Sequence, residues 1–95
     1  MKKGALVTVQ FGHGVRYGMI VSTEVFNLPV HRLFFVPADR KRKEVGLEVQ
    51  MGEYVFQPDK LMSINDKLHI TEAGVADPTV TEDVCKRIRL IMDLG

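Results

Sequence analysis

The side chains best suited to chemistry stand at the ends of predicted strands. They are acids, bases and a cation, namely His13, Arg16, Asp39 and Asp59. An imidazole titrates near neutral pH and can act as an acid or a base, and a carboxylate can act as a base. The basic run Arg40-Lys41-Arg42-Lys43 follows Asp39 directly and is suited to phosphate contacts along an RNA backbone. Proton transfer beside a phosphate backbone is the chemistry that these residue types would support.

Aromatic side chains in the predicted strands can stack on bases where they are exposed. They are Tyr17, Phe34, Phe35 and Tyr54. Neighbouring residues of a strand point to opposite faces, so at most one of Phe34 and Phe35 lies in the core of a two-layer structure.

Every one of these candidates also has a purely structural interpretation. Asp39 and Asp59 can be turn aspartates that bond their own backbone, and His13 can be an exposed turn histidine. Arg16 can be a solvated arginine at the end of a strand. The basic run can be a solvated loop. From the residues alone, each candidate can therefore have either a chemical or a structural role.

Motifs for metal, cofactor and nucleotide chemistry are missing from the sequence. It contains no phosphate loop, cluster of metal ligands or nucleophile elbow, and Gly12-His13-Gly14 lacks the third glycine and the following helix of a dinucleotide fingerprint. The single Cys85 can form neither an internal disulfide nor a paired-ligand zinc site. We therefore expect no cofactor and no metal.

The elements that must position the candidates are short strands. Apolar residues alternate with polar ones over residues 5–11, glycines then predict a turn at 12–14, and a second strand is expected over 17–23. Asn27-Leu28-Pro29 breaks the pattern. A dense apolar run over 31–36 predicts a central strand that stops at Pro37.

The second half of the chain continues the strand pattern. Alternation is clearest over residues 45–51, and Gly52-Glu53 is suited to a hairpin into a strand over 54–56 that ends at Pro58-Asp59. Residues 61–70 predict one more strand, or two strands with a turn at Asn65-Asp66.

The C-terminal segment carries the signals of an amphipathic helix over about residues 79–93. Thr79 is expected to cap it, with Glu82 completing a capping box. The apolar face contains Val84, Cys85, Ile88, Ile91 and Met92. We expect this face to pack against the strands as core rather than to form a groove for a partner.

These elements predict an α+β, mostly β fold, a small SH3-like barrel of 5–7 short strands with one C-terminal amphipathic helix. The chain has 95 residues, 45% of them hydrophobic, and shows no linker or repeat, so residues 1–95 are expected to form one domain. So short a chain buries a small core, which favours a homodimer. It has no apolar run near the roughly 20 residues of a membrane span and no signal-peptide pattern, so we expect a cytoplasmic protein.

Four short segments, taken in order and spacing, resemble a known family. They are Gly4 to Phe11, Arg16 to Ser22 with Phe26-Asn27, Leu33 to Pro37, and Pro58 to Ile64. Together they resemble the landmarks of the MazF/PemK toxins of the CcdB/MazF superfamily. The stretch from Arg16-Tyr17 through Leu28-Pro29 to Val36-Pro37 is also similar to the CcdB branch. Both branches imply a single toxin domain, a homodimer and neutralisation by a cognate antitoxin.

The MazF/PemK resemblance implies a metal-independent endoribonuclease that cleaves single-stranded RNA through its 2′-hydroxyl. Arg16 lies at the spacing of the family's catalytic arginine and would stabilise the reacting phosphate, with Asp39 or His13 assisting proton transfer. The residues expected to bind substrate are Arg40, Lys41, Arg42, Lys43, Tyr17 and Asp59.

This sequence departs from the family near the expected site. The turn before Arg16 is shorter and lacks the family's glutamate, and three further positions differ. Tyr17 stands in place of a proline, Asp39 in place of a threonine, and Gln57 in place of an arginine that some members carry two residues before the position of Asp59. These changes keep a non-enzymatic alternative open.

The alternative is a CcdB-like binder that inhibits DNA gyrase, or a degenerate relative that only binds a partner. The chain contains no tryptophan and ends Met92-Asp93-Leu94-Gly95, unlike the Trp-Gly-Ile ending of the CcdB branch, which disfavours gyrase. A third possibility is an unrelated SH3-like interaction domain.

Overall fold

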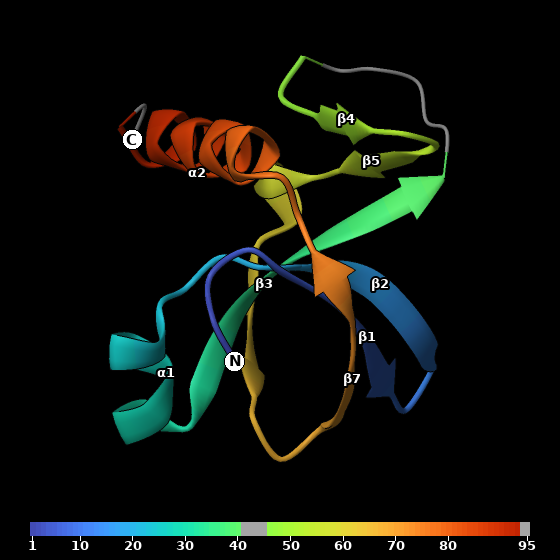
Figure 1. Cartoon of the computed structure of the whole chain (residues 1–95), viewed down its shortest axis with the longest axis vertical. Helices are drawn as coiled ribbons and strands as arrows, with labels where there is room; N and C mark the ends of the chain where they lie inside the picture. Colours follow the sequence, from blue (N-terminus) through green and yellow to red (C-terminus); the bar gives the residue numbers. More distant parts are fainter. Residues whose placement is uncertain (41–45, 94–95) are drawn as a thin grey trace.

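The computed structural model describes residues 1–40 and 46–93, and the remaining residues are left undescribed. The described strands are β1 (Ala5–Phe11), β2 (Gly14–Ile20), β3 (Arg32–Arg40), β4 (Val49–Met51), β5 (Tyr54–Phe56), β6 (Met62–Asn65) and β7 (His69–Val75). The helices are α1 (Glu24–Val30), the 3₁₀ helix η1 (Pro58–Lys60) and α2 (Pro78–Asp93). The expected mostly β, α+β class with a C-terminal helix is confirmed (Figure 1).

All strand pairs of the sheet are antiparallel, in the order β4-β5-β3-β2-β1-β7. The long strand β3 has two partners along one edge: its first part pairs with β6 and its last part with β5. The sheet bends strongly, so that β6, which pairs with β3, and β7, which pairs with β1, are joined by a turn at the bottom of the view (Figure 1). The strand pattern is thus consistent with the small barrel-like fold expected from the sequence.

The bent sheet buries apolar side chains on both faces. One cluster, under α2, includes Met19, Val36, Phe56 and Val84, and we call this side of the sheet the Phe56 face. The other cluster lies inside the bend, and we call its side the Phe35 face. Its buried members are Ala5, Val7, Val9, Ile20, Leu33, Phe35 and Ile64. Strand β1 contributes to both clusters: Leu6 lies in the cluster of the Phe56 face, and Ala5, Val7 and Val9 lie in the cluster of the Phe35 face.

Pro37 lies inside β3, so the prediction that it stops this strand was wrong. Pairing with β6 ends at Phe35 and pairing with β5 begins at Ala38, so the proline stands where the partner strand changes. The Pro37 carbonyl accepts a hydrogen bond from the Gln57 amide at 2.9 Å. A missing N–H is tolerated at such a break in the ladder. Phe35 is fully buried and Phe34 is half-buried, because neighbouring residues of a strand point to opposite faces.

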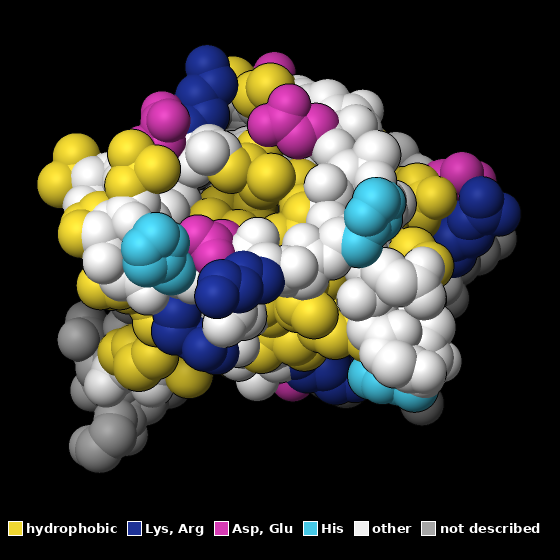
Figure 2. Space-filling model, turned by 90° about the horizontal axis from the view of Figure 1, so that it is seen from below, with side chains coloured by type: hydrophobic (Ala, Val, Ile, Leu, Met, Phe, Trp, Pro, Cys, Tyr) yellow, Lys and Arg dark blue, Asp and Glu magenta, His cyan; other side chains and the backbone are white. Residues whose placement is uncertain are grey.

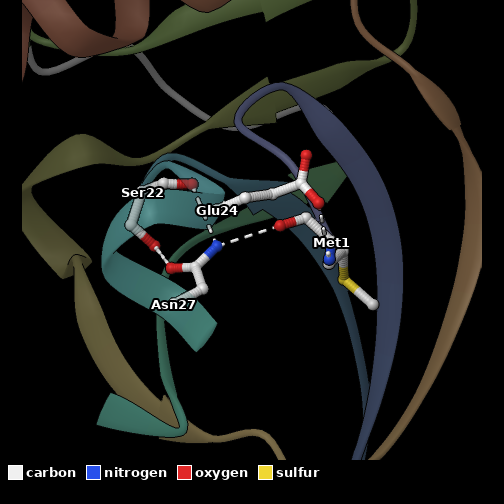
Figure 3. Close-up of polar contacts among 4 residues, drawn as sticks. All are labelled: Met1, Ser22, Glu24 and Asn27. Atoms are coloured by element: carbon white, nitrogen blue, oxygen red, sulfur yellow. Dashed lines mark hydrogen bonds and ion pairs between the residues drawn. The ribbon is translucent and has the colours of Figure 1, made fainter. Parts of the chain in front are cut away.

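Helix α1 occupies the segment that was expected only to interrupt the strands. Pro29 lies inside this helix, and His31 ends it in the left-handed region with φ of 54°. The helix is held by buried Asn27 rather than by an apolar face. The Asn27 side chain donates to the carbonyls of Met1 and Ser22 and accepts from the Ser22 hydroxyl, while the Met1 amino group lies 4.0 Å from the Glu24 carboxylate (Figure 3).

Several strand boundaries also differ from the prediction. Strand β2 spans Gly14–Ile20 rather than 17–23, because the tight turn lets pairing with β1 begin at once. Strand β4 begins only at Val49: Leu47 and Glu48 precede it, and Val45 lies outside the described residues. The turn at Asn65-Asp66 does separate two strands, but β7 continues to Val75 because it follows β1 along its length.

Helix α2 matches the predicted span within one residue, but its cap differs. The Asp77 carboxylate accepts from the Thr79 amide at 2.8 Å and from the Thr79 hydroxyl at 2.6 Å. Glu82 instead pairs with Arg89 at 3.1 Å, so the expected capping box is wrong. Val84 and Cys85 are buried as predicted, whereas Met92 is exposed. In the described part of the chain, no helix is long and apolar enough to cross a membrane.

Candidate active site

Arg16 and Asp39 are brought together by the pairing of β2 with β3. The register aligns Tyr17 with Ala38, which places Arg16 beside Asp39 on the same face. The Arg16 Nη2 atom lies 3.6 Å from Asp39 Oδ1. Their side chains are 32% and 37% exposed, so a ligand can reach both. Arg16 therefore pairs with Asp39, one of the two residues expected to assist it in proton transfer.

Gln57 completes this cluster from the end of β5. Its side chain is buried, at 3% exposure, and its Nε2 atom donates to Asp39 Oδ2 at 2.7 Å. Asp39 is thus held at one oxygen by an amide and faces a guanidinium at the other. The buried Gln57 Oε1 atom has no hydrogen-bond partner among the described residues. The sequence marked Gln57 only as a departure from the family, because nothing local shows that it reaches Asp39.

The Arg16 side of the sheet can be assigned from the β1–β2 register. Val9 stands directly opposite Arg16, and residues opposite each other in an antiparallel pair project to the same face. Val9 belongs to the buried cluster of the Phe35 face. Arg16 therefore projects to the Phe35 face, and Tyr17, its neighbour in the strand, projects to the Phe56 face.

His13 lies in the turn between β1 and β2 and is exposed. Its ring stacks on Phe11, with ring centroids 5.5 Å apart and an angle of 16° between the planes. Phe11 in turn contacts buried Phe35, at 6.5 Å between ring centroids. His13 is therefore linked to the Phe35 face through Phe11, on the side of the sheet that also carries Arg16.

Tyr17 and Arg40, expected to bind substrate, lie together away from Arg16. The Tyr17 ring packs on Tyr54 at 4.5 Å, and the Arg40 guanidinium lies 5.6 Å from the Tyr54 ring centroid and 3.8 Å from Glu53. Partial burial, and then the nearby Tyr54 hydroxyl, raise the pKa of Tyr17, so its phenol stays protonated well beyond neutral pH. The structure thus separates these two residues from the Arg16 pair.

One remaining candidate lies in η1, and the others lie outside the described part of the chain. Asp59 is an exposed residue of η1, the short helix that follows Gln57. Lys41, Arg42 and Lys43 of the basic run belong to the undescribed segment 41–45. The role of all four in binding substrate stays a prediction.

The molecule is hollowed on the side where α1 and the turns of β1–β2 and β6–β7 lie. Seen from there, hydrophobic atoms form the floor of the hollow and charged side chains of both signs stand around it (Figure 2). A cavity of about 230 Å³ on this side is lined by residues that include Leu33, Leu68 and Asp66. Leu33 belongs to the cluster of the Phe35 face and Leu68 packs against it, so this cavity lies on the same side of the sheet as Arg16.

A second cavity, of about 360 Å³, opens beside α2. Its apolar lining includes Val21, Phe34, Leu61, Ile88 and Met92, with Lys3 and Arg89 also lining it. The Phe34 ring also stacks on Phe26 of α1 at 5.3 Å. Apolar surface therefore continues from this cavity towards α1.

Comparison with solved structures identifies the fold. No protein-family model matches the chain, and no curated protein sequence matches it. A chain of the MazE–MazF complex (Form-III) of Deinococcus radiodurans superposes with a TM-score of 0.90 at 17% identity, covering 100% of this chain and 98% of that chain. MazF (Form-I) of the same organism gives 0.86 at 20% identity, with 98% and 96% covered.

A mycobacterial structure of an endoribonuclease in complex with its cognate antitoxin gives a TM-score of 0.87 at 18% identity, with 100% of this chain and 97% of that chain covered. The chain therefore has the fold of MazF toxins over its whole length. This agrees with the family that the sequence landmarks resemble.

Proposed function

We propose that this protein is the toxin of a toxin–antitoxin pair and that it cleaves single-stranded RNA without a metal ion. The observation that carries the proposal is the Arg16–Asp39 pair, with 3.6 Å between Nη2 and Oδ1, on the open face of a MazF-like fold. RNA cleavage by the 2′-hydroxyl needs a base for that hydroxyl and a cation for the reacting phosphate. Asp39 can supply the base, and Arg16 can supply the cation.

In the proposed reaction, the 2′-oxygen forms a bond to the adjacent phosphorus while the bond from phosphorus to the 5′-oxygen breaks. Asp39 takes the proton of the 2′-hydroxyl, and Arg16 donates N–H groups to the non-bridging phosphate oxygens. The leaving 5′-oxygen takes a proton from water, and the hydroxide that remains takes the proton held by Asp39, which restores the carboxylate. The products are a 2′,3′-cyclic phosphate and a free 5′-hydroxyl.

Arg16 can serve the phosphate without releasing Asp39. A guanidinium carries five N–H donors in a rigid fork, and at 3.6 Å from Asp39 Oδ1 the Arg16 Nη2 atom makes a loose ion pair rather than a close hydrogen bond. Gln57 holds the opposite oxygen of Asp39, which keeps the carboxylate beside Arg16 when the charge of the phosphate arrives. Gln57 therefore acts as a positioning residue in the proposed mechanism.

The test is cleavage of a long single-stranded RNA in EDTA by wild type, Arg16→Ala and Arg16→Lys. We expect discrete fragments from wild type and a loss of about 10²- to 10³-fold in Arg16→Ala, because a donor to the developing charge is removed. Arg16→Lys keeps the charge without the fork and should recover only part of the rate. Arg89→Ala, an exposed arginine on α2, is the matched control and should cleave normally.

Intact RNA in every lane would contradict the ribonuclease assignment and favour the non-enzymatic alternative on the same fold. Inhibition of gyrase supercoiling by purified protein would then be measured. Equal cleavage by wild type and Arg16→Ala would retain a nuclease but remove Arg16 from its centre.

The proposal includes a homodimer and a cognate antitoxin. Exposed apolar side chains support protein partners: Val25 is 86% exposed and Leu28 65% on α1, and Leu90 and Met92 are exposed on α2. Light scattering of the purified chain tests the dimer. Co-purification with the product of an adjacent gene, followed by loss of RNA cleavage in the complex, tests the antitoxin.

A further inference from the structure

We propose that Phe11 and His13 form a stacking platform for an unpaired nucleobase of RNA, next to Arg16. The inference rests on the proposed ribonuclease function and deepens it, because it assigns a base-binding subsite beside the phosphate-binding arginine. His13 would then act through the flat face of its ring rather than through proton transfer.

The two rings are already arranged as an aromatic stack. Their planes are nearly parallel, at 16°, with 5.5 Å between ring centroids. Phe11 is half-buried and rests against fully buried Phe35, so the lower ring is fixed by the core. His13 above it is exposed. A base can therefore stack on a preformed, anchored surface, which limits the entropy lost on binding.

The platform and Arg16 lie on the same face at neighbouring positions. Val9 stands opposite Arg16, and Phe11 is two residues beyond Val9 on β1, so Phe11 is the diagonal neighbour of Arg16. Diagonal neighbours in an antiparallel pair have Cα atoms about 7–8 Å apart, within reach of long side chains. A nucleotide can therefore place its base on the platform and its phosphate at Arg16.

The turn that carries His13 leaves room for a ligand. Apart from the residues next to each glycine in the chain, a Cβ atom built on Gly12 or Gly14 would meet no heavy atom within 4 Å. No side chain from a more distant, described part of the chain therefore crowds these two glycines. Open backbone, an exposed ring and a nearby guanidinium are the features that bind single-stranded nucleic acid, in which every base offers a flat face.

The test is binding of a short single-stranded RNA with 2′-O-methyl groups, which cannot undergo cleavage, measured by fluorescence anisotropy. His13→Ala removes the exposed ring and should weaken binding about fivefold or more, the size of a lost base-stacking contact. His13→Phe keeps a flat ring without a titrating group and should bind almost as tightly as wild type. His69→Ala is the matched control: His69 is exposed on β7 beside Gln10, on the other face of β1, and its loss should change nothing.

Three results would overturn the platform. Wild-type affinity in His13→Ala, with binding lost in Arg16→Ala, would remove the platform and leave the ribonuclease proposal standing. Equal losses in His13→Ala and His13→Phe would mean that the imidazole, not a stacked ring, makes the contact. The absence of any RNA binding or cleavage by wild type would overturn both proposals. A double-stranded RNA of the same sequence should show no dependence on His13, because its bases are already stacked.

Discussion

Arg16 on β2 and Asp39 on β3 form a loose ion pair across two adjacent strands, with 3.6 Å between Nη2 and Oδ1. Both side chains are about one-third exposed, and an exposed pair of this kind contributes little to stability, with a typical value below about 1 kcal/mol. The pair therefore adds little to the stability of the sheet, and both side chains stay accessible, as their proposed role in RNA cleavage requires.

Asp39→Asn separates catalysis from binding at this pair. The amide keeps the shape of the carboxylate but cannot accept the proton of the 2′-hydroxyl, so cleavage should fall about 10²- to 10⁴-fold. Binding of 2′-O-methyl RNA should be equal or tighter, because a negative charge near the phosphate is removed. Cleavage at the wild-type rate would show that Asp39 is not the base.

Gln57→Met tests the positioning of Asp39. Methionine has a similar size, and it removes both the 2.7 Å bond to Asp39 and the buried oxygen that has no partner among the described residues. The loss of the hydrogen bond to Asp39 destabilises the fold, whereas the removal of the unsatisfied amide oxygen stabilises it. The free energy of unfolding should therefore change by no more than about 1 kcal/mol. Cleavage should nevertheless fall, with little change in RNA affinity. A variant with normal cleavage at saturating RNA would mean that Asp39 needs no support from Gln57.

Asn27→Ala should destabilise the fold by about 1–3 kcal/mol in urea unfolding, because the Ser22 and Met1 carbonyls and the Ser22 hydroxyl lose buried partners. Val25→Ala, on the same helix and 86% exposed, should change stability by less than about 0.5 kcal/mol. Similar midpoints for wild type and Asn27→Ala would show that α1 is held by other contacts.

Gly18→Ala should destabilise the protein by about 3 kcal/mol, the upper part of the range for overpacking. The added Cβ would lie 2.2 Å from the Val36 carbonyl oxygen and 2.6 Å from the Phe35 ring, so a strand or a core ring must move. Gly12→Ala is the control for the effect of replacing a glycine by alanine without a clash, because a Cβ atom at Gly12 would meet no atom within 4 Å apart from its chain neighbours. Equal unfolding midpoints for the two variants would contradict the close approach of β2 and β3.

Asp77→Ala should lower the Tm in a manner that depends on pH. Bonds from the Thr79 hydroxyl and then the Thr79 amide lower the pKa of Asp77, so its charged form stabilises the folded state above its ordinary pKa of about 3.9. That contribution is lost as the pH falls through the lowered pKa. The Tm difference between wild type and Asp77→Ala should therefore be largest at neutral pH and shrink in acid. A difference that stays constant down to acid pH would mean that the carboxylate charge plays no part in the cap.

Local patterns predicted those elements whose burial follows a regular period. Alternation located β1 at residues 5–11, the glycine-containing hairpin located β5 at 54–56, and the amphipathic spacing located α2. The pattern failed where burial was irregular. Strand β7 is exposed over most of its length and is specified by pairing with β1, and α1 exposes most of its apolar residues and is anchored by Asn27.

The sequence by itself determined the mostly β class, the terminal helix, and a set of candidate residues that included His13, Arg16, Asp39 and Asp59, because strand period and residue type are local properties. The resemblance to the MazF/PemK toxins singled out Arg16 within this set. Tertiary structure alone decided that Arg16 lies beside Asp39, that Gln57 reaches the same carboxylate, and that Tyr17 and Arg40 project to the other face. These relationships follow from the register between strands distant in sequence. Register is set by the whole packed sheet, since a shift of one residue would turn every side chain to the opposite face.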